Sequence, residues 1–278
     1  MKQLRLADLW ALCKPRVTLL VLVTGLVGVI AAPGSPTLGA TISALFGIAL
    51  VVAGANALNM FLERDLDAKM TRTRNRPLPA GRLAPRWAAL FGVLCGVVAV
   101  PLLGILHNWL TGLLAGASLV VYVWVYTPLK QRSWTALLVG AVPGAMPPLL
   151  GWTAMSGRID SGALLLFAVL FFWQLPHFLA IAIFRGDEYR RAGIRTVPDH
   201  SGPEGARRFA WGTASLLLVV SLSAPWAGVG HTISLVTAAV LGLGFLALAL
   251  RPLGSDGGKR WSRQLFLFSL IYLPLVYS

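Results

Sequence analysis

Long runs of apolar residues without a charged side chain dominate this sequence. Apolar residues make up 56% of the 278 positions and charged residues only 12%, and the mean hydropathy is +0.73. A soluble chain of this length would expose a surface richer in charge than these proportions allow. A helix needs roughly 20 apolar residues to cross the hydrocarbon core of a bilayer, and the runs have that length. We therefore predict an all-α integral membrane protein.

The runs predict a bundle of nine transmembrane helices that forms one membrane-embedded domain over residues 1–278. The predicted spans are 16–32, 38–62, 88–106, 109–127, 135–155, 161–184, 209–228, 231–250 and 264–277. An odd number of spans places the two termini on opposite sides of the membrane.

The distribution of basic residues predicts the orientation of this bundle. A net charge of +14 would suggest a nucleic-acid partner for a soluble protein. Here, however, 23 of the 24 Lys and Arg residues lie in the N-terminal segment or in connections on its side of the membrane, and the opposite connections contain only Arg158. Because basic loops stay in the cytoplasm, we predict a cytoplasmic N-terminus, a C-terminus outside and no nucleic-acid partner.

The first long cytoplasmic connection opens with a spaced set of oxygen-bearing side chains. Asn59, Glu63 and Asp67 are four residues apart, so a helix stacks them along one face. Magnesium is commonly held by one or two carboxylates together with phosphate oxygens of a substrate. Asp65 is out of phase and faces elsewhere. An ordinary solvated helix end is the alternative interpretation, but Asn59 lies deep enough in an apolar span to need a polar partner.

Basic residues follow these acids directly. Arg72 and Arg76 are the two that we assign to a ligand, because arginine binds phosphate oxygens through two parallel hydrogen bonds. Acids for a metal beside arginines for oxyanions predict a diphosphate site on the cytoplasmic face. The alternative is that these arginines bind no ligand and only mark the cytoplasmic side, since cytoplasmic loops are basic in any membrane protein.

Two later cytoplasmic connections have a similar composition. Tyr126, Lys130 and Arg132 lie at the end of the fourth span, and Asp187 and Glu188 follow the sixth. A second pair of carboxylates opposite the first would let two metal ions hold one diphosphate.

His177 follows Pro176 inside an otherwise apolar span. An intramembrane histidine is a candidate site residue, although a histidine that is hydrogen-bonded to a neighbour is the commoner case. Cys13 and Cys95 are far apart and have no metal-ligand spacing, which favours a packing role for both.

With these residues in place, the chain resembles the UbiA superfamily of membrane prenyltransferases, and within it the protohaem IX farnesyltransferases, or haem O synthases. The resemblance covers nearly the whole chain. Its blocks are Lys14 to Arg16, Asn59 to Pro77, Tyr126-Thr127 with Lys130, Gly140 to Trp152, and Trp173 to Phe178 leading to Tyr189. Glu63 stands where the superfamily usually has Asp, and the second acidic motif is only Asp187-Glu188.

The resemblance implies a UbiA-type fold in a bacterial inner (plasma) membrane. It implies that Mg²⁺ assists ionisation of farnesyl diphosphate and that the farnesyl group joins a vinyl group of haem B to give haem O. The implied site residues are catalytic Asn59, Glu63, Asp67 and Tyr126; diphosphate-binding Arg72, Arg76, Lys130 and Arg132; haem-binding His177; and metal-binding Asn59, Glu63, Asp67, Asp187 and Glu188. A haem A synthase or a terminal oxidase is the protein partner that such a product suggests.

Three other functions fit parts of the pattern. An aromatic prenyltransferase that makes a quinone or chlorophyll precursor would have a fuller second Asp motif and no need for His177. An anion transporter would place ionisable groups near the bilayer midplane in broken helices, whereas here the charges cluster on one face. An oxidase assembly factor without enzymatic activity would tolerate loss of Asp67.

Overall fold

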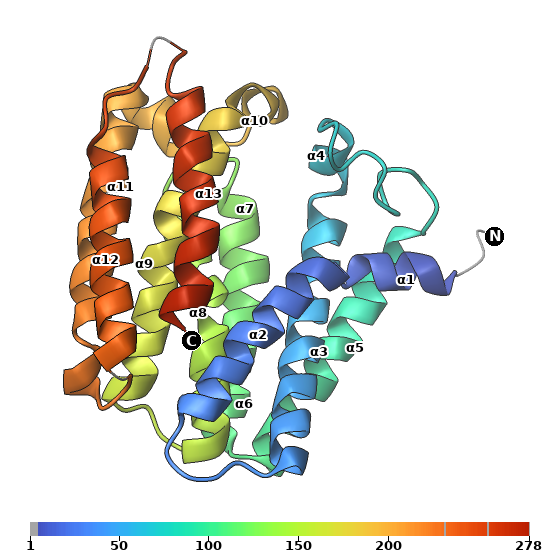
Figure 1. Cartoon of the computed structure of the whole chain (residues 1–278). Coiled ribbons are helices and arrows are strands. Elements are labelled where there is room, and N and C mark those ends of the chain that lie inside the picture. The colour runs from blue at the N-terminus through green and yellow to red at the C-terminus, as the bar shows by residue number, and fades with distance from the viewer. Residues whose placement is uncertain (1–4, 231, 255, 278) are drawn as a thin grey trace. The chain divides into compact units, whose positions relative to one another are not determined.

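The computed structural model describes residues 5–230, 232–254 and 256–277, and within these ranges the chain is helical with no β-strand (Figure 1). The elements are α1 Leu6–Leu12, α2 Pro15–Ala31, α3 Leu38–Leu62, α4 Arg64–Ala68, α5 Pro85–Leu106, α6 Trp109–Val120, η1 Val121–Tyr126, α7 Thr127–Leu129, α8 Ala136–Ser156, α9 Ser161–Phe184, α10 Gly186–Ala192, α11 Val197–Leu222, η2 Ala224–Ala227, α12 Thr232–Leu250 and α13 Lys259–Val276. The predicted all-α class is confirmed.

The length and apolar character of these helices are those of a multi-pass membrane protein. Six helical segments of the described chain are long and apolar enough to cross a bilayer: α3, α5, Trp109–Leu129, α8, α9 and α12. The α1–α2 pair, bent by 49°, would make a seventh span. Two further predicted spans overlap α11 and α13, which begin with charged turns. The predicted count of nine and the orientation therefore stay predictions. Residue 231, which opens one predicted span, lies outside the described residues.

The described chain divides into two compact units. The first comprises residues 1–128 and 146–159, and the second comprises residues 129–145 and 160–278. Helix α8 contributes its first half to the second unit and its second half to the first. That the whole chain acts as one domain stays a prediction.

The first unit depends on glycines where two helices approach closely. A Cβ built at Gly28 of α2 would overlap the backbone of Pro148 in α8, and one built at Gly151 would overlap the carbonyl group of Gly25. Apolar helices have no hydrophobic driving force for association inside a bilayer, so close backbone approach at small residues supplies the packing energy instead. Gly151, at the end of the Gly-rich block over residues 140–152, thus has a structural role in α8.

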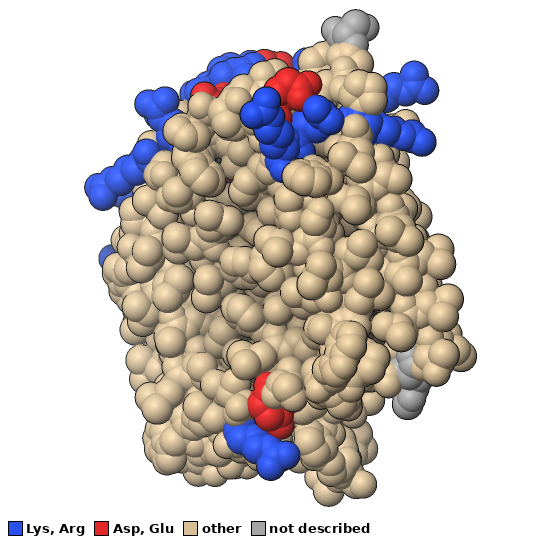
Figure 2. Space-filling model, turned by 90° about the vertical axis from the view of Figure 1, so that its left-hand side faces the viewer, with Lys and Arg blue, Asp and Glu red and all other residues tan. Residues whose placement is uncertain are grey.

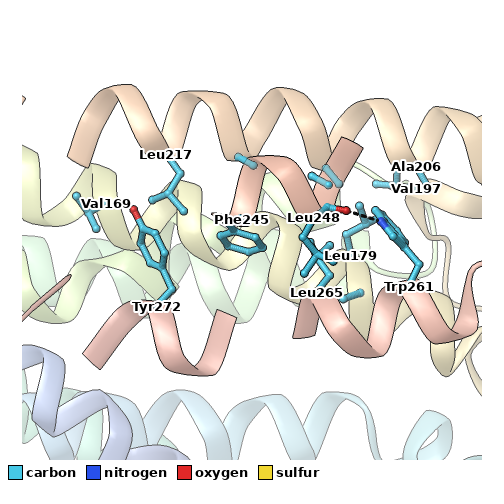
Figure 3. Packing of buried hydrophobic residues seen from close by; sticks show 14 of the residues in the cluster. Val169, Leu179, Val197, Ala206, Leu217, Phe245, Leu248, Trp261, Leu265 and Tyr272 are labelled. Atoms are coloured by element: carbon cyan, nitrogen blue, oxygen red, sulfur yellow. Dashed lines mark hydrogen bonds between the residues drawn. The ribbon is translucent and has the colours of Figure 1, made fainter. Parts of the chain in front are cut away.

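The second unit encloses a core of large side chains (Figure 3). Phe245 and Tyr272 are fully buried, with ring centroids 5.7 Å apart. The Trp261 indole N–H donates to the Leu248 carbonyl oxygen at 2.9 Å, which satisfies the one polar atom of that ring. This contact joins the end of α12 to the start of α13.

Charge is distributed unevenly over the surface that Figure 2 presents. Lys and Arg side chains gather at one end of this face and are sparse across its middle, which is covered by uncharged residues. An uncharged middle beside a charged end is the pattern of a protein whose middle is solvated by lipid.

Candidate active site

The three predicted metal ligands lie on successive turns where α3 ends. The Glu63 amide donates to the Asn59 carbonyl at 2.9 Å, and the Asp67 amide donates to the Glu63 carbonyl at 2.7 Å. Helical spacing therefore continues across the junction between α3 and α4. All three residues are buried, with 2%, 7% and 1% of their surface exposed, respectively. Asp65, predicted to face elsewhere, has a side chain that is 87% exposed.

The loop after α4 folds back onto Asp67. The Arg76 Nη1 lies 2.6 Å from the Asp67 Oδ2, and the Thr73 hydroxyl donates to the Asp67 carbonyl at 2.8 Å. A carboxylate with 1% exposure needs such a partner, because an unpaired buried charge is strongly unfavourable. Of the two predicted phosphate-binding arginines, Arg76 is in the site and paired with an acid, whereas Arg72 lies exposed on the same loop.

Both polar atoms of the Asn59 side-chain amide are hydrogen-bonded. Its Oδ1 accepts from the Lys14 ammonium group at 3.3 Å, and its Nδ2 donates to the Thr127 hydroxyl at 3.1 Å. The Thr127 hydroxyl in turn donates to the Tyr122 carbonyl at 2.8 Å. Lys14, between α1 and α2, and Thr127 of α7 thus both bind Asn59, and they are the polar partners that its position in an apolar span requires.

Lys14 contacts the candidate site through Asn59, although it was not among the predicted site residues. It lies between α1 and α2 with φ +47°, and it is the one residue other than glycine with positive φ in the described chain. The left-handed conformation is unfavourable for a residue with a Cβ, and such strain concentrates at functional sites. The sequence signal that could have pointed to Lys14 is a lysine followed by proline at the start of a span.

Tyr126 lies in a short π-helix, η1, rather than in a regular α-helix. Within it the Thr127 amide donates to the Tyr122 carbonyl, five residues back, and the Tyr122 and Tyr126 rings lie 5.2 Å apart. A π-helical turn is rare and occurs frequently at functional sites. The extra residue in the turn changes the direction of the side chains that follow it.

The buried acids fit a magnesium ion whose coordination shell is completed by water and by phosphate oxygens of a bound substrate. No group of three or more His, Cys, Asp or Glu side chains in the described ranges is placed to hold a metal. Glu63, Asp67 and the Asn59 amide instead offer two carboxylates and one amide oxygen. This is an open donor set, and Mg²⁺ usually completes such a set with water and phosphate oxygens.

The remaining predicted cationic residues lie in the second unit. The Lys130 carbonyl accepts from the Arg195 amide at 2.9 Å, which ties the connection before α8 to the segment after α10. Arg132 is exposed.

Asp187 and Glu188 begin the short helix α10. Asp187 is exposed and contacts Arg190 and Lys259, and the hydrogen bond from Arg190 and the charge of Lys259 hold the pKa of its carboxyl below its usual range. The Glu188 Oε2 lies 3.3 Å from Arg185. Adjacent helical residues point about 100° apart, so each acid meets a different cation.

His177 is enclosed in the second unit. It is 8% exposed, and its ring stacks on Trp173 with centroids 4.8 Å apart. Its Nδ1 lies 2.7 Å from the Ser269 hydroxyl on α13. Both the predicted site role and the commoner hydrogen-bonded role agree with this environment.

Comparison with known proteins decides the family. The model of the UbiA prenyltransferase family matches residues 20–271, which includes the end of α3 with its acids. The chain belongs to the UbiA prenyltransferase family. The protoheme IX farnesyltransferase of Anaeromyxobacter dehalogenans (strain 2CP-C) is 47% identical over 272 residues, which cover 98% of this chain and 92% of that protein.

Solved structures confirm the UbiA fold. A structure of digeranylgeranylglyceryl phosphate synthase aligns with a TM-score of 0.83 at 15% identity, covering 98% of this chain and 95% of the other. A UbiA homologue from Archaeoglobus fulgidus bound to GPP and Mg²⁺ aligns with a TM-score of 0.71 at 15% identity, covering 97% and 98%. At these identities the likeness concerns the fold.

Proposed function

We propose that this UbiA-family protein transfers the farnesyl group of farnesyl diphosphate to a vinyl group of haem B, giving haem O. The relative from A. dehalogenans supports this substrate pair, because it is 47% identical and nearly all of its length is covered. The observation that carries the chemistry is the buried set Asn59, Glu63 and Asp67 with Arg76 beside it. No feature of the described residues favours an aromatic acceptor, anion transport or a purely structural assembly role.

Glu63, Asp67 and Asn59 are the proposed magnesium ligands. The Mg²⁺ of the homologue with bound GPP supports a divalent ion in this fold. Bound there, the ion would neutralise the diphosphate and so weaken the allylic C–O bond. The Lys14 ammonium group already contacts the Asn59 amide oxygen, so this oxygen would be shared or yielded when a metal binds.

Arginine and lysine side chains complete the diphosphate site in this proposal. Arg76 would pass from Asp67 to a phosphate oxygen as the metal takes its place on the carboxylate. Arg72, Lys130 and Arg132 are the further predicted phosphate ligands. Positioned cations of this kind act on charge that develops during bond cleavage, and they need little reorganisation at that moment.

The group transfer needs no protein nucleophile. The bond between the farnesyl C1 and the diphosphate oxygen breaks, and diphosphate leaves with the electron pair. The terminal carbon of the vinyl group then bonds to C1, water adds its oxygen to the other vinyl carbon, and a proton is released. Tyr126 would stabilise the allylic cation by its ring face, and the π-helical turn is what positions this ring.

His177 is the proposed contact to the haem acceptor, and Asp187 with Glu188 are the proposed ligands of a second metal ion. We also propose nine spans with a cytoplasmic N-terminus and an external C-terminus in the bacterial inner membrane, so that the acids face the cytoplasm. The one-sided distribution of the basic residues supports this orientation. A haem A synthase or terminal oxidase would receive the product.

A substrate panel tests the proposal. Purified protein is supplied with farnesyl diphosphate and Mg²⁺, and with either haem B or a hydroxybenzoate-type aromatic acceptor, and products are identified by mass spectrometry. We expect a hydroxyfarnesylated haem and no prenylated aromatic. Prenylation of the aromatic acceptor alone would replace this proposal with the quinone-precursor function.

A further inference from the structure

The hydrogen bonds around His177 define which of its ring nitrogens carries the proton. The Ser269 Oγ lies 2.6 Å from the carbonyl oxygen of Phe266 and 2.7 Å from the His177 Nδ1. A carbonyl oxygen can only accept, so the single hydroxyl proton of Ser269 is donated to Phe266. Ser269 must then accept from His177, and this requires a proton on Nδ1.

With the proton on Nδ1, the other ring nitrogen of a neutral imidazole has a free lone pair. No hydrogen bond joins the His177 Nε2 to any residue of the described ranges. The two ring faces are covered, by Trp173 at a centroid distance of 4.8 Å and by Phe266 at 4.9 Å. The Phe178 ring also packs on it, at a centroid distance of 5.3 Å and an interplanar angle of 74°. A metal that binds this imidazole would therefore do so through the Nε2 lone pair, in the plane of the ring.

The ring is also fixed in place. The Trp173 indole N–H donates to the Ser269 carbonyl at 2.7 Å, so the residue that orients the imidazole also anchors the aromatic ring stacked on it. Ser269 is completely buried. A histidine whose second ring N–H is bonded to a fixed acceptor is the usual arrangement of a metal-ligating imidazole, because the hydrogen bond sets the tautomer and the ring orientation.

We propose that Ser269 is a positioning residue that holds His177 as the Nδ1–H tautomer, so that Nε2 binds the iron of the haem acceptor as an axial ligand. This inference rests on the proposed function and adds to it a tautomer, an orienting residue and a mode of acceptor binding. A histidine that only packs would need no fixed tautomer.

Haem titration of the purified full-length chain tests the inference without turnover. Ferric haem B is added in detergent, and the optical and EPR spectra report axial ligation. We expect an imidazole-ligated spectrum for the unmodified protein. His177→Ala should lose that spectrum and regain it when imidazole is added. Ser269→Ala should weaken haem affinity by about 10- to 100-fold, whereas Ser269→Thr, which keeps the hydroxyl, should bind as the unmodified protein does.

Ser262→Ala is the matched control. Ser262 is a completely buried serine on the same helix, and its hydroxyl donates three residues back, to Lys259, as that of Ser269 does to Phe266. It should bind haem with unchanged affinity and spectrum. A wild-type spectrum in His177→Ala, or equal affinities for Ser269→Ala and Ser262→Ala, would overturn the inference. If the unmodified protein forms haem O and yet gives these results, only the inference fails; if it forms no haem O, the proposed function fails.

Discussion

Asp67 and Arg76 form an ion pair in which the acid is buried and the arginine partly exposed, with the arginine Nη1 2.6 Å from the carboxylate Oδ2 and the aspartate side chain 1% exposed. The proposed function assigns the acid to a metal and the arginine to a diphosphate. Each therefore neutralises the other until the substrate complex arrives, and each then acquires a new partner of opposite charge. A buried acid would otherwise lack a counter-charge in the free protein.

Arg76→Gln should lower the free energy of unfolding by about 3 kcal/mol, because Asp67 loses its counter-charge while it stays buried. Thermal unfolding in detergent measures this effect. The double variant Asp67→Asn with Arg76→Gln removes both charges and should recover most of the stability without recovering activity. Arg74→Gln, on the same loop but exposed, is the control and should unfold as the unmodified protein does. Equal stability of Arg76→Gln and Arg74→Gln would exclude a structural role for the pair.

Lys14→Ala should reduce kcat/KM for farnesyl diphosphate by about 10- to 100-fold, since a hydrogen bond from a charged donor is worth about 1.5–3 kcal/mol. Lys14→Gly should lose as much activity but be the more stable of the two, because glycine adopts the positive φ of this position without steric cost. Steady-state kinetics and thermal unfolding separate these effects. Arg16→Gln, on an exposed neighbour, should leave both quantities unchanged. Full activity of Lys14→Ala would remove Lys14 from the site.

The sequence predicted the bounds of two long helices well. Helix α3 occupies residues 38–62 and α9 residues 161–184, both at the predicted bounds, because hydropathy and span length are local properties. The four-residue spacing of Asn59, Glu63 and Asp67 is also a local property, because these residues lie on successive helical turns.

The contacts between distant residues were not predictable in this way. Lys14 reaches Asn59 across 45 positions, and its left-handed backbone depends on the bend between α1 and α2. Arg76 contacts Asp67 because the intervening loop turns back, a path that no periodicity encodes. The π-helical turn before Thr127 likewise leaves no signature in an apolar run.

Gly151→Ala should destabilise the protein by about 1–3 kcal/mol, because the added Cβ overlaps the Gly25 carbonyl and two packed helices must separate. Gly212→Ala is the matched control: it too is a helical glycine, but nothing lies within 4 Å of the added carbon. Its stability should be equal or slightly higher, since alanine favours helix over glycine. The two unfolding temperatures, measured in one detergent, test the close approach of α2 and α8. Equal temperatures would contradict it.

Metal stoichiometry tests the second proposed metal site. Titration with Mn²⁺ in the presence of a non-cleavable farnesyl thiodiphosphate, followed by EPR, should give two ions per chain. The double variant Asp187→Asn with Glu188→Gln should retain one ion, and Glu204→Gln, an exposed acid paired with Arg207, should retain two. A single ion in the unmodified protein would restrict the metal to Glu63 and Asp67. Asp187 would then be a structural partner of Arg190 and Lys259.

The central claim is that the buried acids at the end of α3 drive cleavage of an allylic diphosphate. Its most direct test is haem O formation by Glu63→Gln in membranes supplied with haem B, farnesyl diphosphate and Mg²⁺, beside Asp65→Asn as the exposed neighbour. We predict that Glu63→Gln loses activity by about 100-fold or more and that Asp65→Asn keeps it. Near-normal haem O formation by Glu63→Gln would contradict the account.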